Sequence, residues 1–146
     1  MKAKTLGLSM LLFVAAPGLA FAADKIEYFT FQNAVDAATQ SGKLDGTVKF
    51  YLAGNTPSGQ ANVVLSDVEV TRKTNAFGKK DPVTCDWALQ SALISLQDEA
   101  KQAGANAVID IVSNYGHEFR DSQRYECHVG FLMSGVMLKA KLAKVQ

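Results

Sequence analysis

The chain has two cysteines, Cys85 and Cys127, and each falls on the apolar face of the element predicted around it. Between Asp81 and Gly104, apolar residues recur every three or four positions, which predicts a helix over about 82–103 with one apolar side. That side comprises Cys85, Ala88, Leu89, Ala92, Leu93, Leu96 and Ala100. Apolar residues alternate around Cys127, which predicts a strand. Both sulfurs are therefore expected where the helix packs against a sheet.

The ends of this helix carry recognisable start and stop signals. Asp81 is expected as the N-cap, Pro82 lies in the first turn, and Gly104 ends the helix. Trp87 lies off the apolar side, with Ile94 beside it. Trp87 is either a second packing edge or an exposed aromatic contact, and we favour packing.

Residues 1–22 have the pattern of a secretory signal peptide. Two lysines precede a short apolar stretch, Pro17-Gly18 interrupts it, and Ala20-Phe21-Ala22 places small residues at the two positions that a signal peptidase reads. The apolar run is too short to span a bilayer, and no cysteine follows it to carry a lipid. We therefore expect cleavage after Ala22, export to the periplasm and no stable membrane anchor. Loss of the two lysines changes the formal net charge from +1 to −1.

Export exposes both cysteines to oxidising conditions, so we predict a structural disulfide between Cys85 and Cys127. A bridge between residues 42 positions apart stabilises the fold by about 4 kcal/mol in the loop-entropy model. A redox-active pair is the alternative, although the chain has no Cys-x-x-Cys to activate a thiol. A metal site is less favoured, because Cys127 and His128 are adjacent on a strand and therefore point to opposite faces.

The rest of the pattern predicts one short helix and a set of strands. The expected ranges are a helix within 23–42 and strands over 47–52, 62–72 and 107–115. The longest strand is expected over 124–142, where apolar residues are odd-numbered as far as Met133 and even-numbered from Val136. A change of phase by one residue indicates an inserted residue, so we predict a bulge or sharp bend at Ser134-Gly135.

Two polar segments carry the charged residues of interest. Residues 71–80 are expected as a connection that binds phosphate or an acidic surface, or is simply solvated, and its cations are Arg72, Lys73, Lys79 and Lys80. Residues 116–122 are expected as a hairpin loop whose charged residues form either a site or a solvated turn with weak ion pairs. These residues are His117, Glu118, Arg120 and Asp121.

The order of elements predicts the fold class. After the leader, residues 23–146 are expected to form a single two-layer α+β domain. It would have about four mostly antiparallel strands packed on one long helix, plus the short N-terminal helix. The 48% apolar content is enough for a core, and the near-zero net charge excludes a nucleic-acid binder recruited by charge alone.

Five segments resemble a family of small exported bacterial proteins, some of which are labelled excinuclease ATPase subunits. They are KLDGTVKFYLAG, TRKTNAFGK, CDWALQSALISLQ, GANAVIDIVSNY and YECHVGFLMSGVMLK, within residues 43–139. The chain has no G-x-x-x-x-G-K-[ST] phosphate loop, so ATPase activity is not expected.

A more distant resemblance covers the long helix, GANAVIDI and the strand that contains Cys127. This pattern is similar to YbjQ-like domains and to the stress-sensing lipoprotein of the Rcs envelope phosphorelay. The resemblance implies a small α+β domain, tied by disulfides, that acts through protein contacts without catalysis. The chain departs from that lipoprotein in having no lipid-anchor cysteine and two cysteines rather than four.

The functional expectation is a non-catalytic periplasmic protein that binds an envelope protein or a cell-wall component, with a link to envelope stress. The chain lacks G-x-S-x-G, H-E-x-x-H, S-x-x-K, a dinucleotide-binding loop and an EF-hand loop, so we assign no catalytic residue, cofactor or metal. The expected interaction surface comprises Trp87 and the charged residues of 71–80 and 116–122. One alternative is a thiol-redox or metal-handling protein that uses both cysteines and a histidine. A second alternative is a small hydrolase that uses His117, Glu118 and Asp121.

Overall fold

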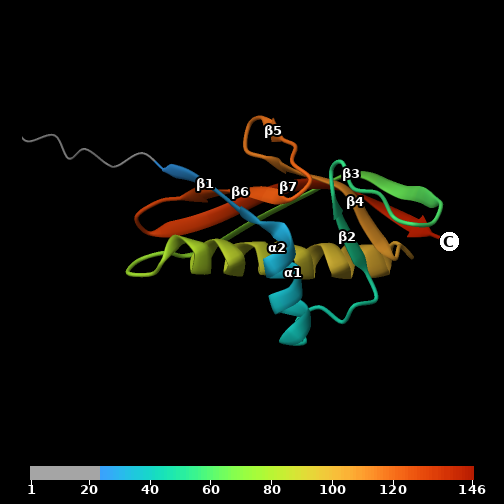
Figure 1. Ribbon diagram of the computed structural model, residues 1–146, viewed down its shortest axis with the longest axis horizontal. Helices are drawn as coiled ribbons and strands as arrows, with labels where there is room; N and C mark the ends of the chain where they lie inside the picture. The colour runs from blue at the N-terminus through green and yellow to red at the C-terminus, as the bar shows by residue number, and fades with distance from the viewer. Residues whose placement is uncertain (1–23) are drawn as a thin grey trace, which may run out of the picture.

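The computed structural model describes residues 24–146 as two helices and a curled, seven-stranded mixed sheet (Figure 1). The predicted signal peptide, residues 1–22, lies outside the described residues. The elements in chain order are β1 (Lys25–Thr30), α1 (Phe31–Gln40), β2 (Lys49–Leu52), β3 (Ala61–Asn75), α2 (Asp81–Gln102), β4 (Ala107–Asn114), β5 (Glu118–Phe119), β6 (Arg124–Val129) and β7 (Met133–Val145). Neither helix of this part of the chain is long and apolar enough to cross a membrane.

The expected layer of four mostly antiparallel strands on one long helix is wrong. The described residues are 44% strand and 26% helix, and the sheet runs in the order β1-β6-β7-β4-β2. β3 also pairs with β7, and β5 pairs with β4. β2 and β4 are parallel, whereas the other pairs are antiparallel. The sequence pattern missed β1 because it runs directly into α1, and β5 because two residues show no periodicity.

The single long strand expected at the end of the described chain is a hairpin of β6 and β7. The backbone N–H of Gly130 donates to the carbonyl of Met133 at 2.8 Å and closes the turn, and His128 then pairs with Gly135 across the ladder. The bulge predicted at Ser134-Gly135 is therefore wrong. The phase of the apolar residues changes because the chain reverses direction between the two strands.

Bulges occur instead in the two longer neighbours of β7. The pairing register with β7 shifts around Asp67 in β3 and around Asp110 in β4. These two residues have φ angles of 55° and 50°, in the left-handed region that aspartate tolerates better than most residues. β3 also continues to Asn75, so the polar connection expected over 71–80 is shorter than predicted.

The long helix predicted over 82–103 is present as α2, and both of its ends lie one residue earlier than predicted. Gly104 lies just beyond the helix, with a φ angle of 72°. The predicted N-cap is wrong. Lys80, which has extended backbone angles and no side-chain cap, holds that position. Asp81 instead accepts a hydrogen bond from the ammonium group of Lys25 at 2.7 Å, which links the start of α2 to β1.

The predicted disulfide is confirmed, with an S–S distance of 2.00 Å between Cys85 of α2 and Cys127 of β6. Both cysteines are fully buried where α2 packs on the sheet. We call this face of the sheet the inner face; its buried residues on β6 and β7 are Tyr125, Cys127, Val129, Val136, Leu138, Ala140 and Leu142. The intervening residues of both strands point to the opposite, outer face. In Figure 1, α2 lies on the inner side of β6 and β7, and the β5 hairpin lies on the outer side.

Candidate functional site

Both histidines of the chain lie beside one buried carboxylate on the outer face of the sheet. The Glu126 side chain is fully buried on β6. The Nε2 atom of His128 lies 2.6 Å from Glu126 Oε1, and the Nε2 atom of His117 lies 3.4 Å from Glu126 Oε2. We refer to these three residues as the Glu126 cluster.

The local sequence explains how the cluster forms. Because side chains alternate along β6, the inward position of Cys127 places Glu126 and His128 together on the outer face. His117 arrives from the turn after β4, where Gly116 has a φ angle of 73° that permits the reversal. Sequence reasoning used the alternation to separate Cys127 from His128. The same alternation would have paired His128 with Glu126.

Residues from the end of β4 enclose the cluster. The ring of Tyr115 stacks on the imidazole of His128, with 3.6 Å between centroids and 10° between planes. The hydroxyl of Ser113 accepts a hydrogen bond from the backbone N–H of Glu126 at 2.9 Å. Burial, and then the charges of Asp24 and Glu126, raise the pKa of Tyr115. Glu126 Oε2 is a buried acceptor with no hydrogen-bond partner among the described residues.

The other charged residues of the β5 hairpin do not join His117. Glu118 accepts a hydrogen bond from Arg120 at 3.1 Å. Asp121 accepts hydrogen bonds from the backbone N–H groups of Gln123 and Arg124, both at 2.8 Å, and these bonds lower the pKa of Asp121. The three side chains considered for a hydrolase therefore have three different partners.

A second polar cluster surrounds Lys139 and Lys141 on the outer face. The two bulges direct Asp67 to within 3.3 Å of the Lys139 ammonium group and Asp110 to within 3.1 Å of that of Lys141. Arg120 also bonds Asp110 at 2.9 Å, and it is the main cause of the lowered pKa of Asp110. These charges border a hollow of about 200 Å³ and neutralise one another, so they leave no excess charge to attract an ionic ligand.

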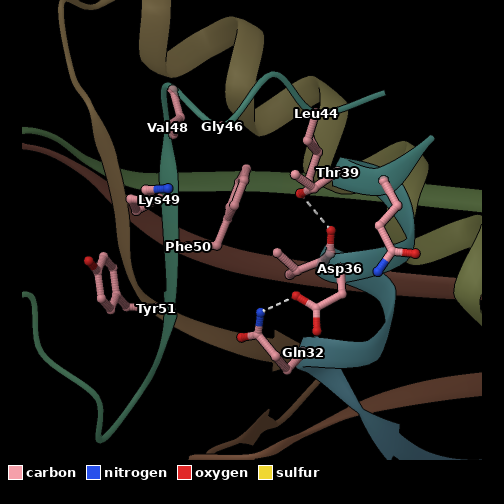
Figure 2. Close-up of a pocket in the computed structure, with 11 residues that line it drawn as sticks. Gln32, Asp36, Thr39, Leu44, Gly46, Val48, Lys49, Phe50 and Tyr51 are labelled. Atoms are coloured by element: carbon pink, nitrogen blue, oxygen red, sulfur yellow. Dashed lines mark hydrogen bonds between the residues drawn. The ribbon is translucent and has the colours of Figure 1, made fainter. Parts of the chain in front are cut away.

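A shallow groove of about 360 Å³ lies between α1 and β2 (Figure 2). Phe50 points into it, whereas Lys49 and Tyr51 point away. The polar side chains on its α1 side are largely paired with each other or with the helix, since Gln32 donates to Asp36 at 2.8 Å and Thr39 donates to the Val35 carbonyl at the same distance. The groove therefore offers an apolar floor without convergent polar groups.

Among the described residues, the three most exposed large apolar side chains, with Met133 beside them, gather at one end of the molecule, in the β6–β7 turn and the β3–α2 loop. Phe131 is 75% exposed, Leu132 60%, Phe77 59% and Met133 45%. Figure 1 shows both loops at the left end of the sheet, and the Ala76 N–H donates to the Leu132 carbonyl at 2.8 Å. The rings of Phe77 and Phe131 meet edge to face at 5.4 Å. We refer to Phe77, Phe131, Leu132 and Met133 as the apolar tip.

The remaining residues of the predicted interaction surface lie at the same end or along β3. Trp87 is 43% exposed, near the start of α2, rather than packed. The guanidinium of Arg72 bonds the Ser95 hydroxyl on α2, and Lys73 follows on the same strand. Lys79 and Lys80 lie in the loop that carries Phe77. Sequence reasoning missed the tip, although three consecutive apolar residues at 131–133 cannot all be buried by an alternating strand.

Comparisons with protein-family models, with curated proteins and with solved structures found no match to this chain.

Proposed function

We propose that the mature chain is a non-catalytic binding module of the bacterial periplasm that docks onto an envelope protein through the apolar tip. The observation that carries this proposal is the exposure of four large apolar side chains that two separate loops bring together. Clustered exposed apolar residues at one place on a folded protein are typical of an interaction site. Aromatic side chains such as Phe77 and Phe131 also supply much of the binding energy in protein interfaces.

The chemistry beside the tip favours a protein partner with an acidic border. Lys79 and Lys80 follow Phe77 in the same loop, and both are exposed. Opposite charges around an apolar contact speed association and fix orientation. We therefore expect a partner surface with an apolar centre and nearby carboxylates.

The disulfide supports a periplasmic location and a structural role for the cysteines. Cys85 and Cys127 are fully buried, so an external thiol has no direct access to either sulfur in the folded chain. Reactive cysteines are instead partly exposed and lie in electropositive surroundings. The burial therefore favours the binding module over the thiol-redox alternative.

The test is site-specific photo-crosslinking in the periplasm. A photoreactive phenylalanine analogue replaces Leu132 at the tip, and a matched control carries it at exposed Gln102, at the far end of α2. We expect one discrete heterologous protein adduct from position 132 and none from position 102. The adduct should disappear in the Phe131→Ser, Phe77→Ser double variant that keeps the probe at position 132. Adducts only with lipid, only with a second copy of the chain, or equally from both positions would reject the proposed partner.

A further inference from the structure

We propose that the chain forms a two-fold symmetric dimer in which β3 of one copy pairs antiparallel with β3 of a second copy, centred on Thr71. The interface is the free edge of β3 over residues 69–73. The apolar tip lies beyond Asn75, outside this ladder, so the dimer does not depend on the proposed docking.

The first argument is that one edge of β3 has no strand beside it. β3 bonds to β7 along one side, and no other described strand pairs with it. With 15 residues it is the longest strand in the described part of the chain. Glu69, Thr71 and Lys73 are all exposed. An unpaired edge of this kind presents N–H and C=O groups that another strand can bond.

The hydrogen bonds at the end of β3 show which residues face this free edge. The Ala76 N–H donates to the Leu132 carbonyl at 2.8 Å, which continues the register of β3 against β7. In an antiparallel ladder, residues that bond the neighbouring strand alternate with residues that do not. Even-numbered residues of this stretch therefore bond β7, and the backbone groups of Glu69, Thr71 and Lys73 point to the free edge.

The Thr71 carbonyl already accepts a hydrogen bond from a side chain at this edge. The Arg72 guanidinium donates to it at 2.7 Å and also bonds the Ser95 hydroxyl on α2. A carbonyl oxygen has two lone pairs, so the bond from Arg72 leaves room for a second donor. Arg72 can therefore keep its place when a second strand pairs with the edge.

The charges on this edge are available for a partner. The pairing of β3 with β7 places Glu69 opposite Lys139 and Lys73 opposite Gly135, and both therefore lie on the outer face. Glu69 accepts a hydrogen bond from Asn114 at 3.3 Å. Within residues 24–146, neither Glu69 nor Lys73 forms an ion pair.

These charges select both the partner and the register. Two identical antiparallel strands related by a two-fold axis are centred on one residue. A centre at Glu69, Arg72 or Lys73 places like charges opposite each other, and a centre at Val70 places Lys73 against the bulge. A centre at Thr71 places Glu69 of each copy opposite Lys73 of the other. Facing opposite charges stabilise a pair of strands and facing like charges destabilise it, so the edge is complementary to itself in this register.

The first experiment measures association of the untagged, disulfide-intact mature chain by sedimentation equilibrium. The interface is one short strand edge, smaller than that of a permanent dimer, so we expect a reversible equilibrium between monomer and dimer. Glu69→Lys and Lys73→Glu should each raise the dimer dissociation constant at least about tenfold, because each variant brings two like-charged pairs together. Both side chains are exposed, so neither variant disturbs the core.

Mixing the two variants separates charge pairing from any other effect of the substitutions. In an equimolar mixture of Glu69→Lys and Lys73→Glu, every facing pair has opposite charges, so dimers should form again. Lys49→Glu reverses an exposed charge on β2 and should leave the dissociation constant unchanged.

A cross-link tests the register directly. Facing residues of a bonded antiparallel pair have Cα atoms about 5.5 Å apart, a separation that a disulfide can bridge. We expect a covalent dimer from Thr71→Cys on mild oxidation and none from Asn62→Cys, an exposed position at the other end of the strand. A parent chain that stays monomeric up to millimolar concentration would overturn the proposal. A mixture of charge variants that stays monomeric, or equal cross-linking at positions 62 and 71, would also overturn it.

Discussion

The hydroxyl groups of Thr84 and Ser134 lie 2.8 Å apart in the core and join the first turn of α2 to the start of β7. Both residues are fully buried. We expect Thr84→Val to destabilise the fold by about 1–3 kcal/mol, because it leaves the Ser134 hydroxyl without this partner. Adding Ser134→Ala should recover part of the loss, since both polar groups are then gone. Denaturant unfolding of the parent and the three variants in a double-mutant cycle measures the coupling, and strictly additive losses would contradict it.

Removal of the disulfide should cost more than any single hydrogen bond. The bridge between Cys85 and Cys127 closes a separation of 42 residues, for which the loop-entropy model gives about 4 kcal/mol. The double variant Cys85→Ala, Cys127→Ala should therefore unfold at much lower denaturant concentration than the oxidised chain. The reduced parent chain is the control for the lost bond, because it keeps both sulfur atoms. Equal midpoints for oxidised and reduced chains would show that the bridge adds no stability.

Tyr125 and Asp86 form a bond whose loss should be visible in a titration. The Tyr125 hydroxyl donates to Asp86 at 3.0 Å. Burial raises the pKa of Asp86, and the bond from Tyr125 partly opposes that rise. In Tyr125→Phe the pKa of Asp86 should therefore rise further, which carboxyl NMR detects directly. Stability of the variant at neutral pH should fall by about 1–3 kcal/mol.

The sign of the pH effect follows from the raised pKa. A carboxyl group whose folded pKa exceeds its unfolded value binds more protons when folded, so stability falls as pH rises from 3.8 through the folded pKa. This fall should be larger in Tyr125→Phe than in the parent chain. The substitution keeps the ring that packs against Phe29, so a packing defect alone would lower stability equally at every pH.

Asp110 should give the opposite pH dependence. Its pKa lies below 3.8, with Arg120 as the main cause and Lys141 as a further one. The carboxylate therefore stabilises the fold above pH 3.8, and that stabilisation is lost as pH falls through the folded pKa. Asp110→Asn should be less stable than the parent at neutral pH, and the two curves should converge below pH 3.8. Asparagine also tolerates the positive φ angle, so backbone strain stays nearly constant. Parallel curves would exclude the ion pairs as the cause.

The sequence predicted the parts of the fold that depend on local periodicity. The 3–4 spacing of apolar residues around Cys85 gave α2 to within one residue, and the alternation around Cys127 gave its inward direction. Together they predicted the disulfide. Such patterns report which side of an element is buried, and that was sufficient to bring the two sulfurs together.

The periodicity of apolar residues predicted less of the structure where the chain changes direction and where residues far apart in the sequence meet. The β6–β7 turn is lined by apolar residues, Phe131 and Leu132, which hide it from rules based on polar turn residues. The edge strand β1 is placed by pairing with β6, which is about 100 positions away in the chain. His117 reaches Glu126 only because the hairpin around β5 folds over the outer face. None of these relationships has a local sequence signal.

The place of β7 in the sheet has a consequence for the order of folding. This strand bonds to β3, β4 and β6, and all three precede it in the chain. A chain threaded N-terminus first through a translocation channel would therefore expose β3 and β4 before the strand that holds them side by side. The complete sheet could not assemble until residues 133–145 had crossed, so pairings that close long loops would come late and slowly. Such a topology would leave the sheet in two parts, β1–β6 and β2–β4–β5, until transit is nearly finished.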